Sequence, residues 1–192
     1  GIIADAGMDV LTHCLEAFAS KNATLFTSAL AAAAFRTAFE HLPASFAGDA
    51  GVRGEIHQAA TMAGIAFDNA GLGVCHALSH ALGGRFHLAH GRLNAILLPH
   101  IVRFNAACAA SAYAALAAQC KLSGVPGLCF ALTRLRRKLE LPESLTAAGL
   151  DRGEVLAESG ALCHAALADP CLATNPREVS LTDLHGLLEA AL

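Results

Sequence analysis

The chain has no tryptophan, one tyrosine (Tyr113) and few charged residues, which make up only 15% of its 192 positions. Segments rich in β-branched residues are scarce, whereas alanine and leucine are abundant, so the composition favours helices over strands. The formal net charge of −3 predicts no electrostatic attraction to nucleic acid or to anionic lipid. The length suits one domain, residues 1–192, with a sizeable core.

Signals for export and for membrane insertion are also missing. The seven cysteines form no C-x-x-C pair and their number is odd, which is typical of reduced thiols in a reducing compartment. The first residues lack the basic segment of a secretory signal, and we find no run of about 18 uncharged apolar residues that suggests a membrane span. We therefore expect a cytoplasmic protein. Because the chain starts without methionine, we also expect a piece of a longer protein.

Helical periodicity and capping signals recur along the whole chain, separated by short breaks. We expect helices over residues 5–20, 24–42, 51–67, 72–82, 90–102, 108–122, 125–139, 152–167 and 180–192. Pro43 is expected to end the second of these, the pair Gly83–Gly84 to end the fourth, and Pro99 to kink the fifth. The predicted fold class is all-α, a bundle of about 8–9 helices without a sheet.

The first predicted helix carries an aspartate and a histidine one turn apart. Asp9 and His13 are four residues apart, so their side chains lie on the same face and can reach one ion. The same spacing also occurs by chance in surface or capping pairs. An apolar stripe of Leu11 and Leu15 predicts the buried side of this helix, with Glu16 on the other side.

A second group of histidines is denser than chance suggests. His76, His80, His87 and His90 fall within fifteen residues in a segment with little charge. An unpaired imidazole there would be poorly solvated, which favours use in a metal or active site over a hydrogen-bonded core histidine. One carboxylate and three imidazoles suit a divalent transition metal, above all iron or zinc. The chemistry predicted is that of an ion that polarises an oxygen atom.

Three stretches of the chain, residues 7–17, 70–105 and 169–177, together resemble a known family. The first contains the D-x3-H pair, the second runs from the glycines before His76 through His90 to Asn105, and the third matches the ending D-x-C-x-x-x-N-P-R. They resemble the all-helical C-terminal domain of the iron-dependent (group III) alcohol dehydrogenases. Within that family the chain is most similar to enzymes encoded beside ethanolamine- or propanediol-utilisation genes.

This resemblance implies a fold like that of the C-terminal domain of dehydroquinate synthase and a set of site residues. The implied metal ligands, matched position by position, are Asp9, His13, His76 and His90. His80 matches a histidine that lies beside the nicotinamide and the substrate without binding the metal. The implied ion is Fe²⁺, with Zn²⁺ as the other choice. Two positions depart from the family pattern. Ala89 stands where a proline is usual, and His87 stands where another polar residue is usual, so that His87 could compete for the ion or join a proton path.

The resemblance also implies an activity and a missing part. The full enzyme would interconvert a primary alcohol and an aldehyde with NAD(P), the metal polarising the substrate oxygen. The family's N-terminal Rossmann-like domain carries a G-G-G-S-x-x-D segment for the dinucleotide, and no such segment occurs here. We therefore expect the metal-binding half of the enzyme, inactive alone. Its expected partners are a small alcohol or aldehyde and the absent domain, not nucleic acid or a membrane, and a homo-oligomer is left open.

Two other interpretations remain at this point. The chain could be a relative of glycerol dehydrogenase or 3-dehydroquinate synthase, which share the helical domain and usually bind zinc through three ligands. It could also be a non-catalytic helical metal-binding module. The presence of both Asp9 and a third histidine favours the iron group.

Overall fold

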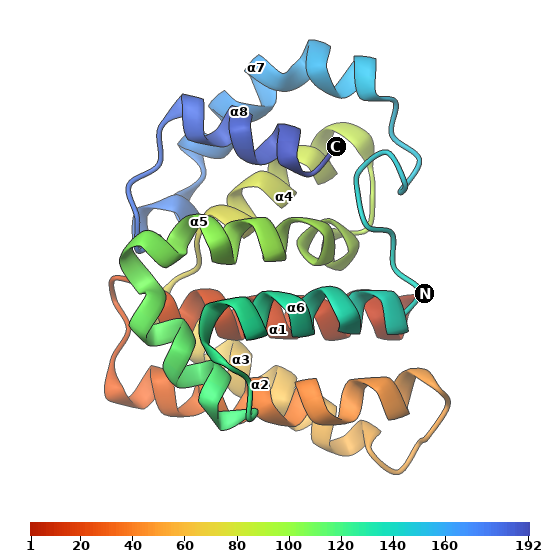
Figure 1. Ribbon diagram of the computed structural model, residues 1–192, viewed down its shortest axis with the longest axis vertical. Coiled ribbons are helices and arrows are strands. Elements are labelled where there is room, and N and C mark those ends of the chain that lie inside the picture. Colours follow the sequence, from red (N-terminus) through yellow and green to blue (C-terminus); the bar gives the residue numbers. More distant parts are fainter.

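The computed structural model describes residues 1–192 and is helical throughout (Figure 1), which confirms the predicted all-α class. Eight α-helices and one short 3-10 helix follow in the order α1 (Ile2–Ala19), α2 (Leu25–Phe46), α3 (Arg53–Ala70), α4 (Val74–Phe86), α5 (His90–Gln119), α6 (Gly124–Lys138), α7 (Arg152–Ala168), η1 (Pro170–Thr174) and α8 (Leu181–Ala190).

The helices form three tiers along the long axis of the molecule (Figure 1). α1 and the first half of α5 run side by side in the middle, and α2 and α3 cover α1 from one side. α4 packs on the other side of α5 and is itself covered by α7, on which α8 packs. The first half of α5 therefore lies between α1 and α4, and these are the three helices that carry the predicted site residues.

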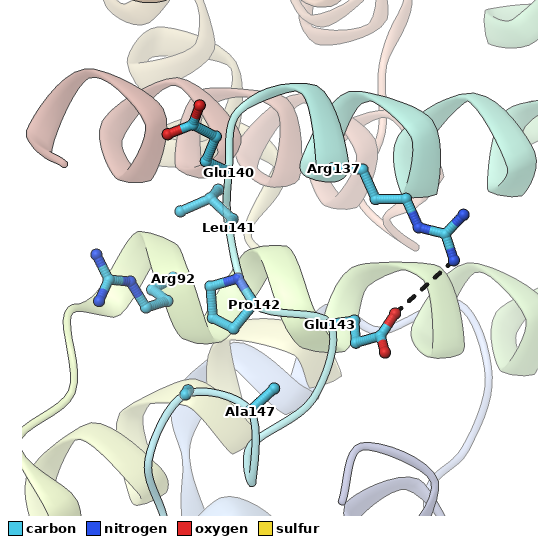
Figure 2. A pocket seen from close by; sticks show the side chains of 8 residues that line it. Arg92, Arg137, Glu140, Leu141, Pro142, Glu143 and Ala147 are labelled. Atoms are coloured by element: carbon cyan, nitrogen blue, oxygen red, sulfur yellow. Dashed lines mark ion pairs between the residues drawn. The ribbon is translucent and has the colours of Figure 1, made fainter.

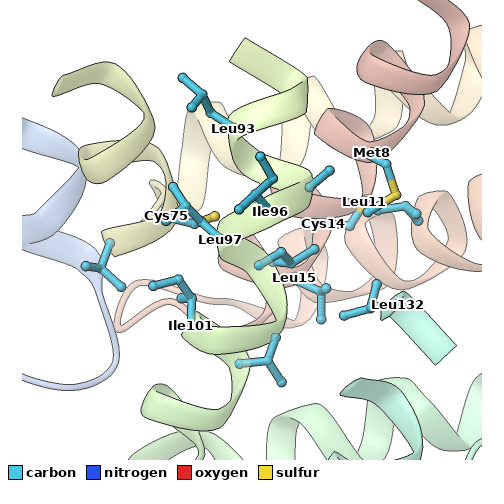
Figure 3. Close-up of a cluster of buried hydrophobic side chains, with 14 of the residues drawn as sticks. Met8, Leu11, Cys14, Leu15, Cys75, Leu93, Ile96, Leu97, Ile101 and Leu132 are labelled. Carbon is cyan, nitrogen blue, oxygen red and sulfur yellow. The ribbon is translucent and has the colours of Figure 1, made fainter. Parts of the chain in front are cut away.

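The core is built where these helices meet. Figure 3 shows Met8, Leu11 and Leu15 of α1 close to Ile96 of α5 in one apolar cluster. Because α1 contacts α2, α3 and α5 at once, it is buried around most of its circumference. The prediction that Glu16 lies on the outer, polar side of this helix is therefore wrong: its side chain is only 3% exposed.

Three predicted breaks fall elsewhere. α2 continues through Pro43 to Phe46, since a proline near a helix end removes only one hydrogen bond there and Ser45 beyond it is buried. The predicted fifth and sixth helices form one element, α5, whose only non-helical dihedral angles lie at Ala109 rather than at Pro99. Three of the five intervening residues, Arg103, Ala106 and Ala107, are good helix formers, so the helix continues and the change of direction falls at the single residue Ala109.

The glycine pair does not end α4 either. The helix runs through Gly83 and Gly84 to Phe86, and His87 ends it in the left-handed conformation with φ of 58°. The N–H of His87 donates to the carbonyl oxygen of Gly83 at 3.0 Å. A helix tolerates interior glycine at a cost of about 1 kcal/mol, whereas a left-handed residue stops it outright. His87 is exposed in this turn, and its expected role beside the ion has no support in its contacts.

By length and composition alone, α5 is apolar enough to cross a membrane. The expectation that no run of about 18 uncharged apolar residues occurs still holds, because Arg92 and Arg103 interrupt α5. Helices in the core of a protein pass the same test, and the first half of α5 packs against α1, α4 and α6.

A glycine lets α1 and α5 approach each other closely near the site. A Cβ atom built on Gly91 would lie 2.0 Å from the carbonyl oxygen of Asp5 on α1, far inside contact distance. The next residue, Arg92, links α5 to α1 at the same place, because its guanidinium donates two hydrogen bonds to the Asp5 carboxylate at 3.1 and 3.2 Å. The separation of α1 and α5 therefore depends on the absence of a side chain at this position.

We predict that Gly91→Ala lowers the free energy of unfolding by about 1–3 kcal/mol or more, because the clash is with backbone that cannot rotate away. The matched control is Gly84→Ala in α4, where an added Cβ meets nothing within 4 Å. That variant is expected to gain about 0.5–1 kcal/mol from helix propensity. Urea unfolding followed by circular dichroism measures both. Equal stability of the two variants would contradict the close-approach argument.

Candidate metal centre

The four predicted metal ligands face one another across three helices. Asp9 and His13 lie on α1, His76 on α4, and His90 is the first residue of α5. The Oδ1 atom of Asp9 lies 3.4 Å from Nε2 of His90, 3.6 Å from Nε2 of His76 and 3.8 Å from Nε2 of His13. A single carboxylate oxygen thus has three imidazole nitrogens around it.

Asp9, His76 and His90 form the compact part of this group. Their donor atoms all lie within 4.8 Å of one another, whereas His13 borders the group. The His13 ring is stacked between Phe67, at a centroid distance of 4.4 Å, and His76, at 4.7 Å. His76 is almost fully buried and His90 is 38% exposed, so the group opens to solvent on the His90 side.

These separations suit a metal ion. Four donors about 2.1 Å from a tetrahedral ion lie about 3.4 Å apart, close to the distances from Asp9 Oδ1 to the three nitrogens. The donor set is one carboxylate and up to three imidazoles, without a thiolate; such a set suits iron and zinc better than magnesium or calcium. The residues present therefore fit a divalent transition metal.

Glu16 makes the strongest contact to any of these histidines. Its Oε2 atom lies 2.5 Å from Nδ1 of His76, and both side chains are buried. A carboxylate in this position holds the Nδ1 proton, so Nε2 is the nitrogen that faces Asp9 and would bind an ion. The sequence-based interpretation missed this role, although residues 9, 13 and 16 follow helical spacing and share one face of α1.

The start of α4 is held by side chains from distant segments. The N–H of Cys75 donates to Oε1 of Glu16 at 2.7 Å, and the N–H of Val74 donates to Oδ1 of Asn175 at 3.2 Å. Gly73 makes room for both acceptors, since a Cβ there would lie 2.8 Å from each oxygen. Two otherwise free N–H groups of the helix are satisfied, and His76 is fixed in direction.

The tail that supplies Asn175 is anchored in turn. The side-chain amides of Asn175 and Asn105 exchange two hydrogen bonds of 2.9 Å, which fasten the tail to α5. Arg177 lies over the ring of Phe104 at 3.8 Å from its centroid and donates to the Phe104 carbonyl oxygen. The ending N-P-R thus braces the helix that carries His76, a role for which the motif alone gave no physical reason.

His90 and Asn94 complete the group from α5. Ser79 donates its hydroxyl proton to the His76 carbonyl oxygen, so its oxygen is left to accept from Nδ1–H of His90 at 3.3 Å. The Nε2 atom of His90 then carries no proton, and its lone pair points toward Asp9 and His76. The Nδ2 atom of Asn94 lies 2.7 Å from Asp9 Oδ1, 3.1 Å from His90 Nε2 and 3.4 Å from His76 Nε2. The Asn94 amide therefore lies against all three of the facing atoms.

The electrostatics of the metal-free group favour a positive charge at its centre. Burial alone would raise the pKa of Asp9, but His76, His90 and His13 hold it well below its usual range. Burial lowers the pKa of His76, yet the Glu16 and Asp9 carboxylates outweigh this effect and raise it to about 9. Burial lowers the pKa of His13 to about 4, despite the attraction of Asp9. Without metal, the proton on His76 therefore balances two carboxylates.

His80 lies beside this group with partners of its own. Its ring stacks on His90 at a centroid distance of 5.2 Å, and its side chain is 45% exposed. The Nδ1 atom lies 2.8 Å from Oδ2 of Asp169, which directly precedes η1. Asp169 was not singled out from the sequence beyond its place in the tail motif. The structure also brings Cys171 close to both residues.

One cavity lies beside the loop that follows α6, away from the predicted site residues. Its volume is about 500 Å³. Figure 2 shows Arg137, which pairs with Glu143, on one side of it and Arg92 on the other. Its charges are balanced and none of the predicted site residues lines it.

Comparison with known proteins identifies the class. The model of the Fe-containing alcohol dehydrogenase family, C-terminal, matches residues 3–192. The chain therefore belongs to the Fe-containing alcohol dehydrogenases and corresponds to their C-terminal part, which confirms the resemblance stated from the sequence.

Particular relatives sharpen the assignment. The 1-propanol dehydrogenase PduQ of Salmonella typhimurium strain LT2 is 42% identical, over 100% of this chain and 55% of that protein. The NADPH-dependent butanol dehydrogenase of Clostridium saccharobutylicum is 34% identical, over 98% of this chain and 50% of that protein. The iron-containing alcohol dehydrogenase structure from Thermococcus thioreducens superposes with a TM-score of 0.94 at 34% identity, covering 99% of this chain and 50% of its own. The chain spans about half the length of these oxidoreductases.

We predict that Glu16→Gln lowers the pKa of His76 in the metal-free protein from about 9 to 6.5 or below, because burial is then opposed by Asp9 alone. A raised imidazole pKa contributes stability that is complete below 6.5 and is lost as the pH rises through about 9. The variant should therefore lose more stability at about pH 6 than at about pH 10.

The measurement is an NMR titration of the His76 imidazole, with urea unfolding at the two pH values. Glu55→Gln is the control, because Glu55 is an exposed acid that pairs with His41 at 2.9 Å, and it should leave His76 unchanged. An unaltered His76 midpoint in Glu16→Gln would contradict the assigned role.

Proposed function

We propose that this chain is the metal-binding, catalytic half of an NAD(P)-dependent alcohol dehydrogenase that interconverts a primary alcohol and an aldehyde. Asp9, His13, His76 and His90 are the proposed ligands of a Fe²⁺ or Zn²⁺ ion. The observation that carries the proposal is the convergence of three Nε2 atoms on one oxygen of Asp9, at 3.4–3.8 Å. When bound, such an ion polarises the substrate oxygen as a Lewis acid.

The neighbours of the ligands support this assignment. Glu16 and Ser79 hold the Nδ1 protons of His76 and His90, which is the arrangement of metal-binding histidines and their hydrogen-bond partners. A divalent cation would replace the proton that the metal-free site keeps on His76. The opening on the His90 side leaves space for a substrate oxygen, whereas the Glu16 side is closed by the core.

His80 is the proposed catalytic residue of this half. It stands at the open side of the group, stacked on His90 and half exposed, where it can contact a substrate. Asp169 accepts from Nδ1 and so fixes the ring and its tautomer, which leaves Nε2 as the atom that exchanges a proton.

The relatives support the substrate and cofactor classes. One is named a 1-propanol dehydrogenase and another an NADPH-dependent butanol dehydrogenase, which points to short primary alcohols and a nicotinamide cofactor. Since this chain matches about half of each, we propose that a Rossmann-like domain corresponding to their other half completes the cofactor cleft.

We predict that His76→Ala or His90→Ala each weakens Fe²⁺ and Zn²⁺ binding by more than about 100-fold, because each removes a direct ligand. Equilibrium dialysis with elemental analysis gives the affinity, and circular dichroism checks that the bundle stays helical. The control is His57→Ala, an exposed histidine on α3. Unchanged metal content in both ligand variants would overturn the assignment.

We predict that the 192-residue chain, loaded with Fe²⁺, forms no NAD(P)H from 1-propanol, because half of the proposed cofactor cleft is missing. A chimera in which the chain replaces the matching half of the Salmonella 1-propanol dehydrogenase should oxidise 1-propanol, and its His76→Ala version should not. Turnover by the isolated chain would contradict the two-part site. An inactive chimera that folds and binds metal would contradict the proposed activity.

A further inference from the structure

Three residues beside the proposed metal centre form a second group of metal donors. His80, Asp169 and Cys171 place one nitrogen, one carboxylate oxygen and one sulfur atom all within 4.8 Å of one another. None of them belongs to the four proposed ligands of the first site. We propose that His80, Asp169 and Cys171 form a second cation site, with the donor chemistry of zinc, at the open edge of the first.

The donor types favour zinc over other common ions. Imidazole, carboxylate and thiolate are the three side-chain ligands that Zn²⁺ uses in proteins. A thiolate disfavours magnesium and calcium, which take oxygen donors. With three protein ligands and a half-exposed histidine, the fourth position would be left to water, as in open zinc sites.

The backbone arranges two of the donors in advance. Asp169 caps η1: its Oδ1 atom accepts the N–H of Cys171 at 2.8 Å. The other oxygen, Oδ2, is the one that faces His80 at 2.8 Å. Pro170, between the two donors, restricts the backbone further. One carboxylate oxygen thus holds the loop, and the other remains available to an ion.

Only a small movement is needed to admit the ion. A tetrahedral zinc ion keeps its nitrogen and oxygen donors about 3.3 Å apart, about half an ångström more than the present contact between His80 and Asp169. His80 is 45% exposed at its side chain, so it has room to shift by that amount. The hydrogen bond between His80 and Asp169 and the bound ion therefore exclude each other. The catalytic role proposed for His80 belongs to the form of the chain in which this second site is empty.

Binding also displaces a proton from the thiol. Burial and the neighbouring Asp169 raise the pKa of Cys171 to about 12, so the thiol is neutral in the metal-free protein. When the ion binds, the S–H bond breaks, a bond between sulfur and zinc forms, and the proton passes to solvent. No electron transfer is involved.

Cobalt(II) titration of the metal-free chain tests the proposal, because a thiolate bound to cobalt gives an intense near-ultraviolet charge-transfer band that nitrogen and oxygen ligands do not. The four proposed ligands of the first site include no sulfur. We expect the native chain to develop this band, saturating at one thiolate-bound cobalt per chain. Cys171→Ala should abolish it, and zinc should displace it.

Matched variants locate the sulfur. Cys75→Ser removes the buried thiol next to His76, and Cys108→Ser removes an exposed one; both should keep the band. His80→Ala, at a half-exposed position where misfolding is not expected, should weaken cobalt binding by more than about tenfold. No band in the native chain, or a band that survives Cys171→Ala, overturns the proposal.

The outcome is separate from that of the proposed function. Asp9→Asn should leave the charge-transfer band intact, because Asp9 is not a donor to this second ion. If the chain binds one metal ion but does not develop the band, the first site is supported and the second site is ruled out. If the native chain develops the band and His76→Ala binds as much metal as the native chain, the second site is supported and the first site is ruled out.

Discussion

The contact between Glu16 and His76 is the interaction on which the rest of the site depends. It joins α1 to α4 inside the core, and Glu16 also caps the first turn of α4 through Cys75. A buried carboxylate is tolerated only when positive charge and hydrogen bonds balance it. Together with Asp9, it makes the middle of an apolar bundle an anionic pocket, which holds a proton in the metal-free protein and which we propose holds a divalent cation in the working one.

Much of the fold could be predicted from the sequence, because helix formers, caps and periodicity are local signals. The capping boxes at Thr24 and Ser180 stand where such signals placed helix starts. The errors came from effects that depend on tertiary contacts or on a single backbone angle. The Gly83–Gly84 pair predicts a stop, but the left-handed conformation of His87 ends the helix. Pro43 predicts a break, but packing carries the helix further, to Phe46.

In the site, too, local signals could be predicted from the sequence and tertiary contacts could not. Histidine density and the D-x3-H spacing indicated the two segments, and the family resemblance selected the four residues within them. The structure brings Asp9, His76 and His90 together with His13 at their side. The supporting residues were missed because their partners are remote in sequence: Glu16 meets a residue 60 positions away, and Asp169 meets one 89 positions away. Asn94, one turn after His90, could have been found from helical spacing. Spacing along one helix shows which residues share a face, but it does not show which neighbouring segment packs against that face.

The most direct test of the account is X-ray absorption of the chain loaded with less than one equivalent of Fe²⁺. Four protein ligands that converge on the Asp9 oxygen predict a shell of nitrogen and oxygen at about 2.0–2.2 Å, with the multiple-scattering pattern of about three imidazoles and no sulfur. A shell with one imidazole or none, or one dominated by sulfur, would contradict the claim that this pocket is built around a cation.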